Sequence, residues 1–248
     1  MDEVLIITGA SRGIGAATAR IAGRSGYVVC VNYLKNKAAA KQIVEEIKAD
    51  GGRALAVGAN ISREDEVVKL FRTVDDKLGK ISALVNNAGI LETQMRIEDM
   101  NEARLNRIFL TNITGSFLCA REAVKRMSTK NGGKGGAIVN VSSAAARLGS
   151  AGEYVDYAAS KGAVDTFTRG LAQEVAEEGI RVNAVRPGVI DTDIHASGGE
   201  PGRVERVKAS IPMKRGGSAE EVAKAIMWLL SSESSYTTGS LLEVSGGR

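Results

Sequence analysis

A tyrosine and a lysine stand four residues apart in this chain, at Tyr157 and Lys161. Residues i and i+4 of a helix lie one above the other on the same face, so an ammonium group would lie within a turn of a phenol. A free phenol has a pKa of about 10, and a nearby cation favours the phenolate and lowers that pKa. The pair is therefore a candidate general acid/base, although the same spacing is also common on helix surfaces without any chemical role.

Two serines, Ser142 and Ser143, close an apolar run at residues 137–141 and precede Tyr157 by fifteen and fourteen residues. We expect a strand that ends in hydroxyl groups, then a loop that contains glycine, then a helix that opens with Tyr157. This order would bring three polar side chains together at the mouth of one cavity. Successive side chains of a strand point to opposite faces, so only one serine can face that mouth if the strand continues through both. The segment 140–161 is the predicted reactive site.

A second candidate site follows the first apolar run, where the turn at residues 8–15 carries Gly9, Gly13 and Gly15. Glycines at a strand-to-helix turn let the backbone approach a pyrophosphate, and the N-terminus of the next helix offers free N–H groups and the positive end of its dipole. A tight turn without a ligand is the alternative. The position of this turn at the start of an alternating chain favours a dinucleotide site.

The end of the second apolar run, at residues 28–32, indicates which dinucleotide is bound. In folds of this kind an acidic residue there binds the ribose 2′-hydroxyl, whereas a nearby arginine accommodates a 2′-phosphate. The segment from Asn32 through Tyr33 to Lys35 contains no Asp or Glu, and Arg12 lies inside the glycine turn. NADP(H) is therefore the predicted cofactor, in preference to NAD(H).

The elements that must position these residues are short apolar runs in alternation with helical segments. Strands are expected at 4–7, 28–32, 54–57, 83–85, 137–141, 181–185 and 241–244, and helices at 16–24, 37–50, 62–77, 98–128, 156–177 and 218–231. The fourth helix should be irregular near 112–115, and 187–211 carries no strong pattern. The alternation predicts one α/β domain over 1–248: a single-domain Rossmann fold, a doubly wound parallel sheet of about seven strands with helices on both faces. The Gly- and Ser-rich segment 193–210 is expected to form a mobile lid.

Composition excludes several other classes of protein. The chain has 248 residues, 44% hydrophobic and 25% charged, which is ordinary for a soluble globular domain. The net charge of +4 comes from scattered side chains and favours a phosphate-bearing ligand over a nucleic-acid surface. Cys30 and Cys119 lie in apolar segments and are expected to be reduced core residues. The first residues resemble no secretory signal, and no apolar run is as long as a membrane span, so a cytoplasmic protein without membrane contact is predicted.

Four motifs resemble the signatures of the short-chain dehydrogenase/reductase family, over essentially the whole chain. They are Thr8-Gly9-x-x-x-Gly13-x-Gly15, Asn86-Asn87-Ala88-Gly89, Tyr157-x-x-x-Lys161 and Pro187-Gly188. The segments 152–162 and 195–202 look most like a glucose-dehydrogenase-like subgroup, and a 3-oxoacyl-reductase-like subgroup is the alternative. The resemblance implies hydride transfer between NADP(H) and a carbonyl or secondary alcohol, possible sugar or polyol substrates, and a homotetramer.

The same resemblance assigns roles to individual residues. Tyr157 would exchange a proton with the substrate oxygen, Ser143 would hydrogen-bond that oxygen, and Lys161 would lower the pKa of Tyr157 and hold the nicotinamide ribose. Asn112 would fix a water in a proton relay, and Thr192, with the backbone at Ile190, would meet the nicotinamide carboxamide. The full expected cofactor set is Gly9, Ser11, Arg12, Gly13, Ile14, Gly15, Asn32, Tyr33, Asn60, Ile61, Asn87, Ala88, Gly89, Tyr157, Lys161, Pro187, Gly188, Ile190 and Thr192.

Two departures from the family pattern leave alternatives open. Asn60 stands where the family usually has Asp against the adenine, and its amide should preserve binding. The interval from Ser143 to Tyr157 is one residue longer than the commonest spacing, so Ser142 remains an alternative unless the loop absorbs the extra residue. A 3-oxoacyl-thioester reductase, a non-catalytic dinucleotide-binding regulator, and dehydration or epimerisation on the same fold remain alternative functions. Substrate choice would depend on 91–97, 144–155 and 193–210.

Several further side chains have two interpretations each. His195, the one histidine, is expected to be an exposed polar residue of the lid, and without partners at ligand spacing it indicates no metal site. Arg147 and Tyr154 either touch the substrate or lie in a surface loop. Trp228 is expected in the core or at a subunit interface.

Overall fold

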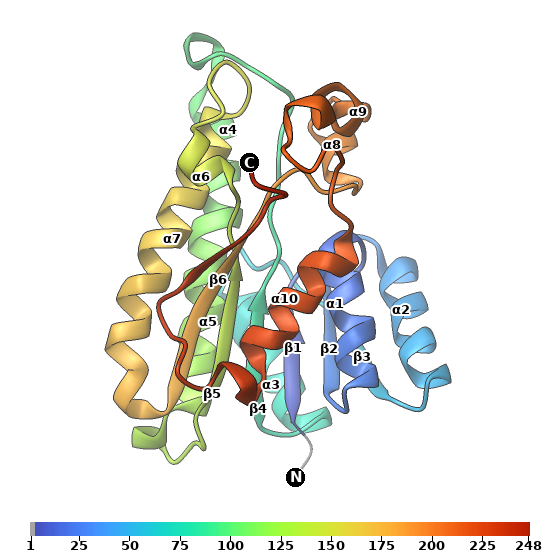
Figure 1. Ribbon diagram of the computed structural model, residues 1–248. Helices are drawn as coiled ribbons and strands as arrows, with labels where there is room; N and C mark the ends of the chain where they lie inside the picture. The colour runs from blue at the N-terminus through green and yellow to red at the C-terminus, as the bar shows by residue number, and fades with distance from the viewer. Residues whose placement is uncertain (1–2) are drawn as a thin grey trace.

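Seven short runs form one parallel sheet in the computed structural model, which describes residues 3–248 (Figure 1). The strands are β1 (Val4–Ile7), β2 (Val28–Tyr33), β3 (Arg53–Gly58), β4 (Ile81–Asn86), β5 (Gly136–Val141), β6 (Ile180–Pro187) and β7 (Leu241–Val244). Their order is β3-β2-β1-β4-β5-β6-β7, and each neighbouring pair is parallel. The predicted Rossmann-type sheet is confirmed, and its order reverses between β1 and β4, where folds of this kind bind ligands.

The core consists of two apolar layers, one on each face of the sheet. Leu5 and Ile7 of β1 pack in one layer with helices α1, α2 and α10, whereas Val4 and Ile6 pack in the other with α3, α5 and α7, as the alternation of strand side chains requires. These helices are α1 (Gly13–Arg24), α2 (Lys37–Ala49), α3 (Glu64–Lys77), α5 (Gly115–Met127), α7 (Val155–Val175) and α10 (Ala219–Leu230). Cys30 and Cys119 are buried and free, as expected.

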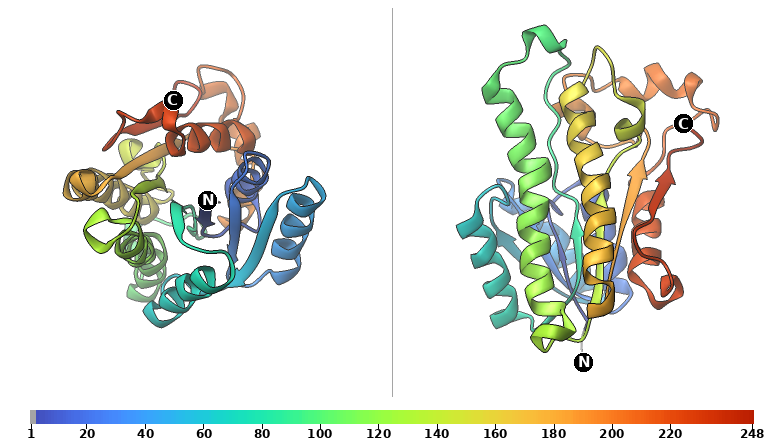
Figure 2. Two further views of the ribbon diagram at one scale, coloured as in Figure 1. Left: turned by 90° about the horizontal axis from the view of Figure 1, so that it is seen from below. Right: turned by 90° about the vertical axis from the view of Figure 1, so that its left-hand side faces the viewer.

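The long helical region of the centre is interrupted, as predicted. It consists of α4 (Glu102–Phe109), a π-helical turn η2 (Leu110–Thr114) and α5, and the right-hand view of Figure 2 shows α4 and α5 running beside α7. The following Gly115 is needed for close packing, because a Cβ atom there would lie 2.6 Å from Cδ1 of Ile61. The region begins at Glu102 rather than at 98, since the side chain of Asn101 caps α4 by accepting from the amide of Arg104.

Two helix starts behave differently from each other. Ser218 and Glu221 form a reciprocal capping box at the start of α10. Residues 62–65 have the sequence pattern of a capping box, which predicts a cap at Ser62. This prediction is wrong: α3 begins at Glu64 without a side-chain cap, because the Ser62 hydroxyl donates instead to Asn60 Oδ1 at 2.7 Å.

The segment without a sequence pattern folds into short helices. These are α8 (Ile194–Ser197), α9 (Arg203–Val207) and a 3₁₀ turn η5 (Lys208–Ser210), which lie beyond the carboxyl ends of the strands in Figure 1. A further short helix, α6 (Ala145–Leu148), lies between β5 and α7. No helix within residues 3–248 has the length and apolar character needed to cross a membrane.

Candidate active site

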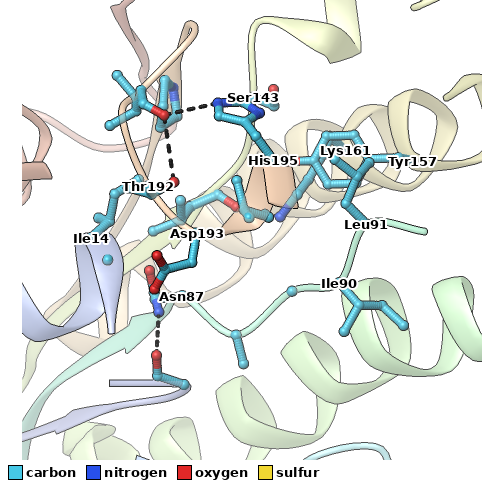
Figure 3. A pocket seen from close by; sticks show the side chains of 18 of the residues that line it. Ile14, Asn87, Ile90, Leu91, Ser143, Tyr157, Lys161, Thr192, Asp193 and His195 are labelled. Atoms are coloured by element: carbon cyan, nitrogen blue, oxygen red, sulfur yellow. Dashed lines mark hydrogen bonds between the residues drawn. The ribbon is translucent and has the colours of Figure 1, made fainter. Parts of the chain in front are cut away.

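A cavity of about 1210 Å³ opens at the carboxyl ends of the strands. Its walls come from the β1–α1 turn, from the ends of β2, β4, β5 and β6, and from the α7 and α8 segments. Figure 3 shows Ser143, Tyr157, Lys161 and His195 in one part of this cavity and Ile14 and Asn87 in another. The two sites predicted separately from the sequence are therefore parts of one space.

The glycine turn forms a backbone cradle at one end of the cavity. Gly9 and Gly13 have φ angles of 61° and 56°, in the left-handed region that favours glycine. A Cβ atom at Gly15 would lie 2.5 Å from Nδ2 of Asn87, a group that donates to the carbonyl of Gly9 at 3.0 Å. Arg12 provides no side-chain cap for α1, so the first N–H groups of the helix stay available to an anion. The cradle fits a pyrophosphate.

The carboxamide of Asn32 is used inside the protein. Its Oδ1 accepts from the amide of Gly9 at 3.2 Å, and its Nδ2 donates to the carbonyls of Val57 and Ala59, each at 3.2 Å. Asn32 therefore holds the glycine turn on β2 and β3. Although it lines the cavity, its side chain has little capacity left for a ribose.

Positive charge lines the cavity beyond β2. Arg12 and Lys35 are lining residues here, whereas the acidic lining residues within 3–248, Glu153 and Asp193, belong to other segments. Arg12 is exposed and reaches the hydroxyl of Ser197 at 3.4 Å. A negatively charged group at this corner would meet two cations and no carboxylate from β2.

Burial dominates the electrostatics of the Tyr157–Lys161 pair. The Lys161 ammonium donates to the carbonyl of Val141 at 2.7 Å and lies 5.6 Å from the centre of the Tyr157 ring. Burial lowers the pKa of Lys161 to about 8, a change that the nearby Asp165 carboxylate opposes. Burial also raises the pKa of Tyr157, and a hydrogen bond with Ser143 opposes this only in part. The expected lowering of the Tyr157 pKa is therefore wrong in direction in the ligand-free protein, since loss of hydration is the largest influence on the phenol.

The two serines have different partners. Ser142 is 2% exposed, and its hydroxyl donates to the carbonyl of Lys161 at 3.2 Å. Ser143 is half-buried, hydrogen-bonds with Tyr157 and accepts from the amide of Ala145 at 3.1 Å. Both serines line the cavity, and of the two it is Ser143 whose side chain hydrogen-bonds with Tyr157.

The loop before Tyr157 has room for its extra residue. Strand β5 pairs with β4 and β6 without a register shift up to Val141. Beyond it, Gly149 and Gly152 have φ angles of 78° and 72°, and Ser150 also has a positive φ of 50°. The irregular backbone is therefore in the loop and not in the buried ladder.

Most of the predicted site residues line the cavity. They are Gly9, Ser11, Arg12, Gly13, Ile14, Asn32, Asn60, Ile61, Asn87, Ala88, Gly89, Ser143, Tyr157, Lys161, Pro187, Gly188, Ile190 and Thr192. Gly15, Tyr33 and Asn112 do not. Gly15 packs against Asn87 beneath the turn, and the Tyr33 ring lies over Gly58, about 3.1 Å from a Cβ built there.

Asn112 lies behind the cavity wall, in the π-helical turn. Its Oδ1 accepts from the amide of Ile90 at 2.8 Å, and its Nδ2 donates to the carbonyl of Ile90 and to the hydroxyl of Ser160. It is 1% exposed. In this geometry Asn112 joins the end of β4 to α7, and the relay role implied by the resemblance stays a prediction.

His195 corrects one expectation. It is 8% exposed rather than a surface residue of the lid, and its Nε2 donates to the carbonyl of Ile190 at 2.9 Å. Tyr154 is likewise buried, lines the cavity and donates to the carbonyl of Gly198 at 3.2 Å. Arg147 lies outside the lining and donates to the C-terminal carbonyl of Arg248. Trp228 is 40% exposed, so it is not a core residue.

Two charged clusters around the mouth were not anticipated. Arg203 of α9 binds Glu153 of the β5–α7 loop and Glu200, and Arg206 joins the same two carboxylates. The guanidinium of Arg206, with that of Arg203, lowers the pKa of Glu200 to about 2. In the second cluster, Arg104 of α4 pairs with Asp156 of α7 in the protein interior. Short sequence patterns do not reveal either connection, because Glu153 is 50 residues from Arg203 and Asp156 is 52 residues from Arg104.

Comparison with known proteins gives matches over nearly the full length. A family model described as enoyl-(acyl carrier protein) reductase matches residues 9–248. An uncharacterized oxidoreductase of Escherichia coli (strain K12), YgfF, is 60% identical over 245 residues, 99% of each chain. A 3-oxoacyl-[acyl-carrier-protein] reductase of Synechocystis sp. is 41% identical over 250 residues, 99% of this chain and 96% of that protein. The reductase FabG of Staphylococcus epidermidis is 35% identical over 247 residues, 100% of this chain and 99% of that protein.

Proposed function

Because the chain belongs to the short-chain dehydrogenase/reductase family and is an oxidoreductase, we propose that it uses NADP(H) to interconvert a carbonyl group and a secondary alcohol. The observation that carries this proposal is the position of Ser143, Tyr157 and Lys161 in the same cavity as the glycine cradle. A binding module without turnover would need the cradle and would not need an acid/base group beside it.

The residues of the cradle fit the proposed cofactor. The turn from Gly9 to Gly15 and the N-terminus of α1 would hold the pyrophosphate, and Arg12 with Lys35 would hold a 2′-phosphate. Lys161 would donate to the nicotinamide ribose, and Thr192 would meet the carboxamide. When bound, the cofactor supplies or accepts the hydride.

Side chains of the protein would donate a proton and a hydrogen bond to the substrate oxygen. Since burial raises the pKa of Tyr157, its phenol stays protonated at neutral pH and can give a proton to the oxygen of a carbonyl that is being reduced. Ser143 would donate a hydrogen bond to the same oxygen, where charge develops in the transition state. The buried Lys161, bound to the Val141 carbonyl, holds its cation beneath Tyr157.

Within this reaction class we propose a 3-oxoacyl thioester ahead of a sugar. The cavity that contains Tyr157 has several apolar lining residues, among them Leu91, Ala144, Leu148, Val189 and Ile194. A polyol would need a hydrogen-bonding partner for each hydroxyl that it buries. Two of the relatives are named 3-oxoacyl-[acyl-carrier-protein] reductases, which supports the thioester.

A substrate panel followed by nicotinamide absorbance tests the proposal. We expect turnover of a short 3-oxoacyl thioester with NADPH and little turnover of glucose with NADP. Tyr157→Phe should abolish turnover and leave NADPH affinity nearly unchanged, because only the transferable proton is lost. Substantial turnover in Tyr157→Phe would contradict the mechanism, and binding of NADPH without turnover of any carbonyl or alcohol would favour the regulator.

The cofactor choice has its own test. Arg12→Ala should remove a charge-assisted hydrogen bond worth about 1.5–3 kcal/mol, and so weaken NADPH about 10- to 100-fold while leaving NADH almost unaffected. Arg20→Ala is the matched control, because Arg20 lies within α1, pairs with Glu46 and does not line the cavity. Equal calorimetric affinities for NADH and NADPH in the parent protein would contradict the assignment.

A further inference from the structure

The ion pair between Arg104 and Asp156 is buried beside the reactive tyrosine. The two side chains are 4% and 1% exposed. The guanidinium of Arg104 donates twice to the carboxylate of Asp156, from Nε to Oδ2 at 2.7 Å and from Nη2 to Oδ1 at 3.4 Å. The right-hand view of Figure 2 shows the start of α4 at the same end of the molecule as the start of α7, and Arg104 and Asp156 belong to these first turns. The pair connects two helices that the chain separates by about fifty residues, since the partners are 52 positions apart.

Asp156 continues this connection to Tyr157. Its Oδ1 accepts from the backbone amide of Tyr157 at 2.9 Å, in the first turn of α7. A carboxylate in the first turn satisfies an N–H group that has no partner within the helix. The carboxylate that pairs with Arg104 therefore also accepts a hydrogen bond from the backbone of Tyr157.

Arg104 has a third contact, with the segment that follows β4. Its Nη1 donates to the carbonyl of Thr93 at 2.7 Å. Thr93 belongs to the segment 91–97, whose neighbouring Leu91 lines the cavity. One planar guanidinium therefore fixes the start of the tyrosine helix and a segment of the substrate wall relative to each other.

Stability alone is a weak reason for such a pair. Removing two charges from water costs free energy that their attraction repays only in part, and well-packed apolar residues of similar volume often replace a buried ion pair without loss. Apolar residues cannot replace the fork of N–H donors on the planar guanidinium of Arg104, which donates to a carboxylate and a carbonyl in fixed positions.

We propose that Arg104 and Asp156 are positioning residues, which hold Tyr157 and the 91–97 segment at the separation that the substrate carbonyl requires. This role rests on the oxidoreductase function proposed above. It predicts that loss of the fork reduces turnover even when the fold is fully stable, because a displacement of about 1 Å at a reacting group can cost about 100-fold in rate.

The decisive variant is the double replacement Arg104→Met with Asp156→Leu. It leaves no unpaired buried charge, so its melting temperature should return close to that of the parent, whereas either single replacement should lower it. We expect kcat of the double variant to stay 10- to 100-fold below the parent, with NADPH affinity within about twofold. A purely structural pair predicts that kcat recovers together with stability, and this result would overturn the proposal.

Arg104→Lys provides a second arm if the double variant does not fold. It keeps the charge but has no fork, so it cannot serve Asp156 and Thr93 together. We expect a folded protein with kcat reduced about tenfold. Parent-level kcat in Arg104→Lys would overturn the proposal. Arg126→Met is the matched control, since Arg126 pairs with the buried Glu122 away from the cavity, and it should lose stability without losing kcat.

Hydrogen exchange separates this proposal from the proposed function, because it requires no substrate. In the double variant, exchange at the Tyr157 amide should accelerate at least tenfold, and exchange in segment 91–97 should also accelerate, while the amides of α1 keep the parent rates. Unchanged exchange at Tyr157 would overturn the positioning role. If the parent turned over no substrate, the proposed function would fail while this readout still decided the role of the pair.

Discussion

At the scale of the residue, burial favours the neutral forms of both Tyr157 and Lys161. It raises the pKa of the phenol and lowers that of the ammonium to about 8, so that the lysine titrates before the tyrosine in the ligand-free protein. The Val141 carbonyl and the Asp165 carboxylate retain the lysine charge at neutral pH against this effect. The cation beneath the phenol is therefore maintained at a cost to stability.

That cost makes the stability of the protein depend on pH. The ordinary pKa of Lys161 is 10.5, and the unfolded chain binds more protons than the folded one between about pH 8 and that value. The free energy of unfolding therefore rises with pH in this window, and the penalty is fully present only below about pH 8. We expect the stability difference between Lys161→Met and the parent to change, in favour of the parent, by up to about 3 kcal/mol from about pH 7 to about pH 10. Denaturant unfolding at both pH values measures it, and a constant difference would contradict the lowered pKa.

The two serines give a second prediction at this scale. Ser143 shares the mouth with Tyr157, so Ser143→Ala should lose about 100- to 1000-fold in kcat, the usual effect of removing a donor to a developing oxyanion. Ser142 donates to the backbone of α7, so Ser142→Ala should stay within about tenfold of the parent. Both single variants are measured with one substrate, and the reverse ranking would move the role to Ser142.

Individual residues were predictable where their partners are local in sequence. The spacing from Tyr157 to Lys161 and the glycine turn each lie in one segment, and both line the cavity. The burial of His195 was not predictable, because it depends on the carbonyl of Ile190 and on the fold of α8. The Arg104–Asp156 pair is also a tertiary feature that no short pattern contains.

At the scale of the element, too, features that depend on local sequence were predictable and features that depend on tertiary contacts were not. The strands and long helices follow from apolar runs and stops, and the irregularity predicted near 112–115 is a π-helical turn over Leu110–Thr114 in the structure. Segment 193–210 had no pattern because its helices have too few residues for a periodicity. Its order comes from tertiary contacts: Arg203 lies 5.0 Å from the centre of the Tyr154 ring and binds Glu153 at 2.5 Å.

These contacts modify the prediction of a mobile lid over 193–210. Since Arg203 is 11% exposed in its side chain and Glu153 27%, loss of their pairing should cost more than a surface ion pair. Glu153→Gln should accelerate hydrogen exchange in 194–210 about tenfold, which corresponds to roughly 1.4 kcal/mol. Addition of cofactor and substrate should slow exchange in the parent. Arg20→Gln, which breaks an ion pair between α1 and α2, is the control. Uniform strong protection of 194–210 in both the parent and Glu153→Gln would rule the lid out.

At the scale of the whole molecule, the doubly wound parallel sheet was the most predictable property. Continuous apolar runs in alternation with helices allow few arrangements besides a doubly wound parallel sheet. The sequence did not predict which surface side chains contact another chain, because an exposed side chain and an interface side chain have the same local pattern. Leu110 and Phe117 illustrate this, since both are 46% exposed on the outer side of the α4–α5 region.

The homotetramer that the family resemblance implies would place these side chains against a second copy of the chain. The rings of Phe117 on α5 and Phe167 on α7 stack with centroids 3.7 Å apart, and a Cβ atom at Gly162 or Gly170 of α7 would meet nothing within 4 Å, so a partner could approach these positions closely. A second set of exposed apolar side chains, Met213, Trp228 and Tyr236, comes from other segments. Two self-complementary surfaces are what a tetramer built from twofold axes requires.

Charge at the centre of the α5–α7 surface should therefore divide the assembly. We expect the parent to have a mass of about four times 26.0 kDa by light scattering, and Phe117→Glu to have about half of that mass, because an unpaired carboxylate would be buried at one of the two interfaces. Circular dichroism should show the same helix content in both proteins, since Phe117 is half exposed within one chain. Tyr236→Glu, on the other apolar group, should also give the half-mass species, and the combination of both replacements should give the single chain. A parent of single-chain mass, or a Phe117→Glu variant that remains at the full mass, would contradict this arrangement.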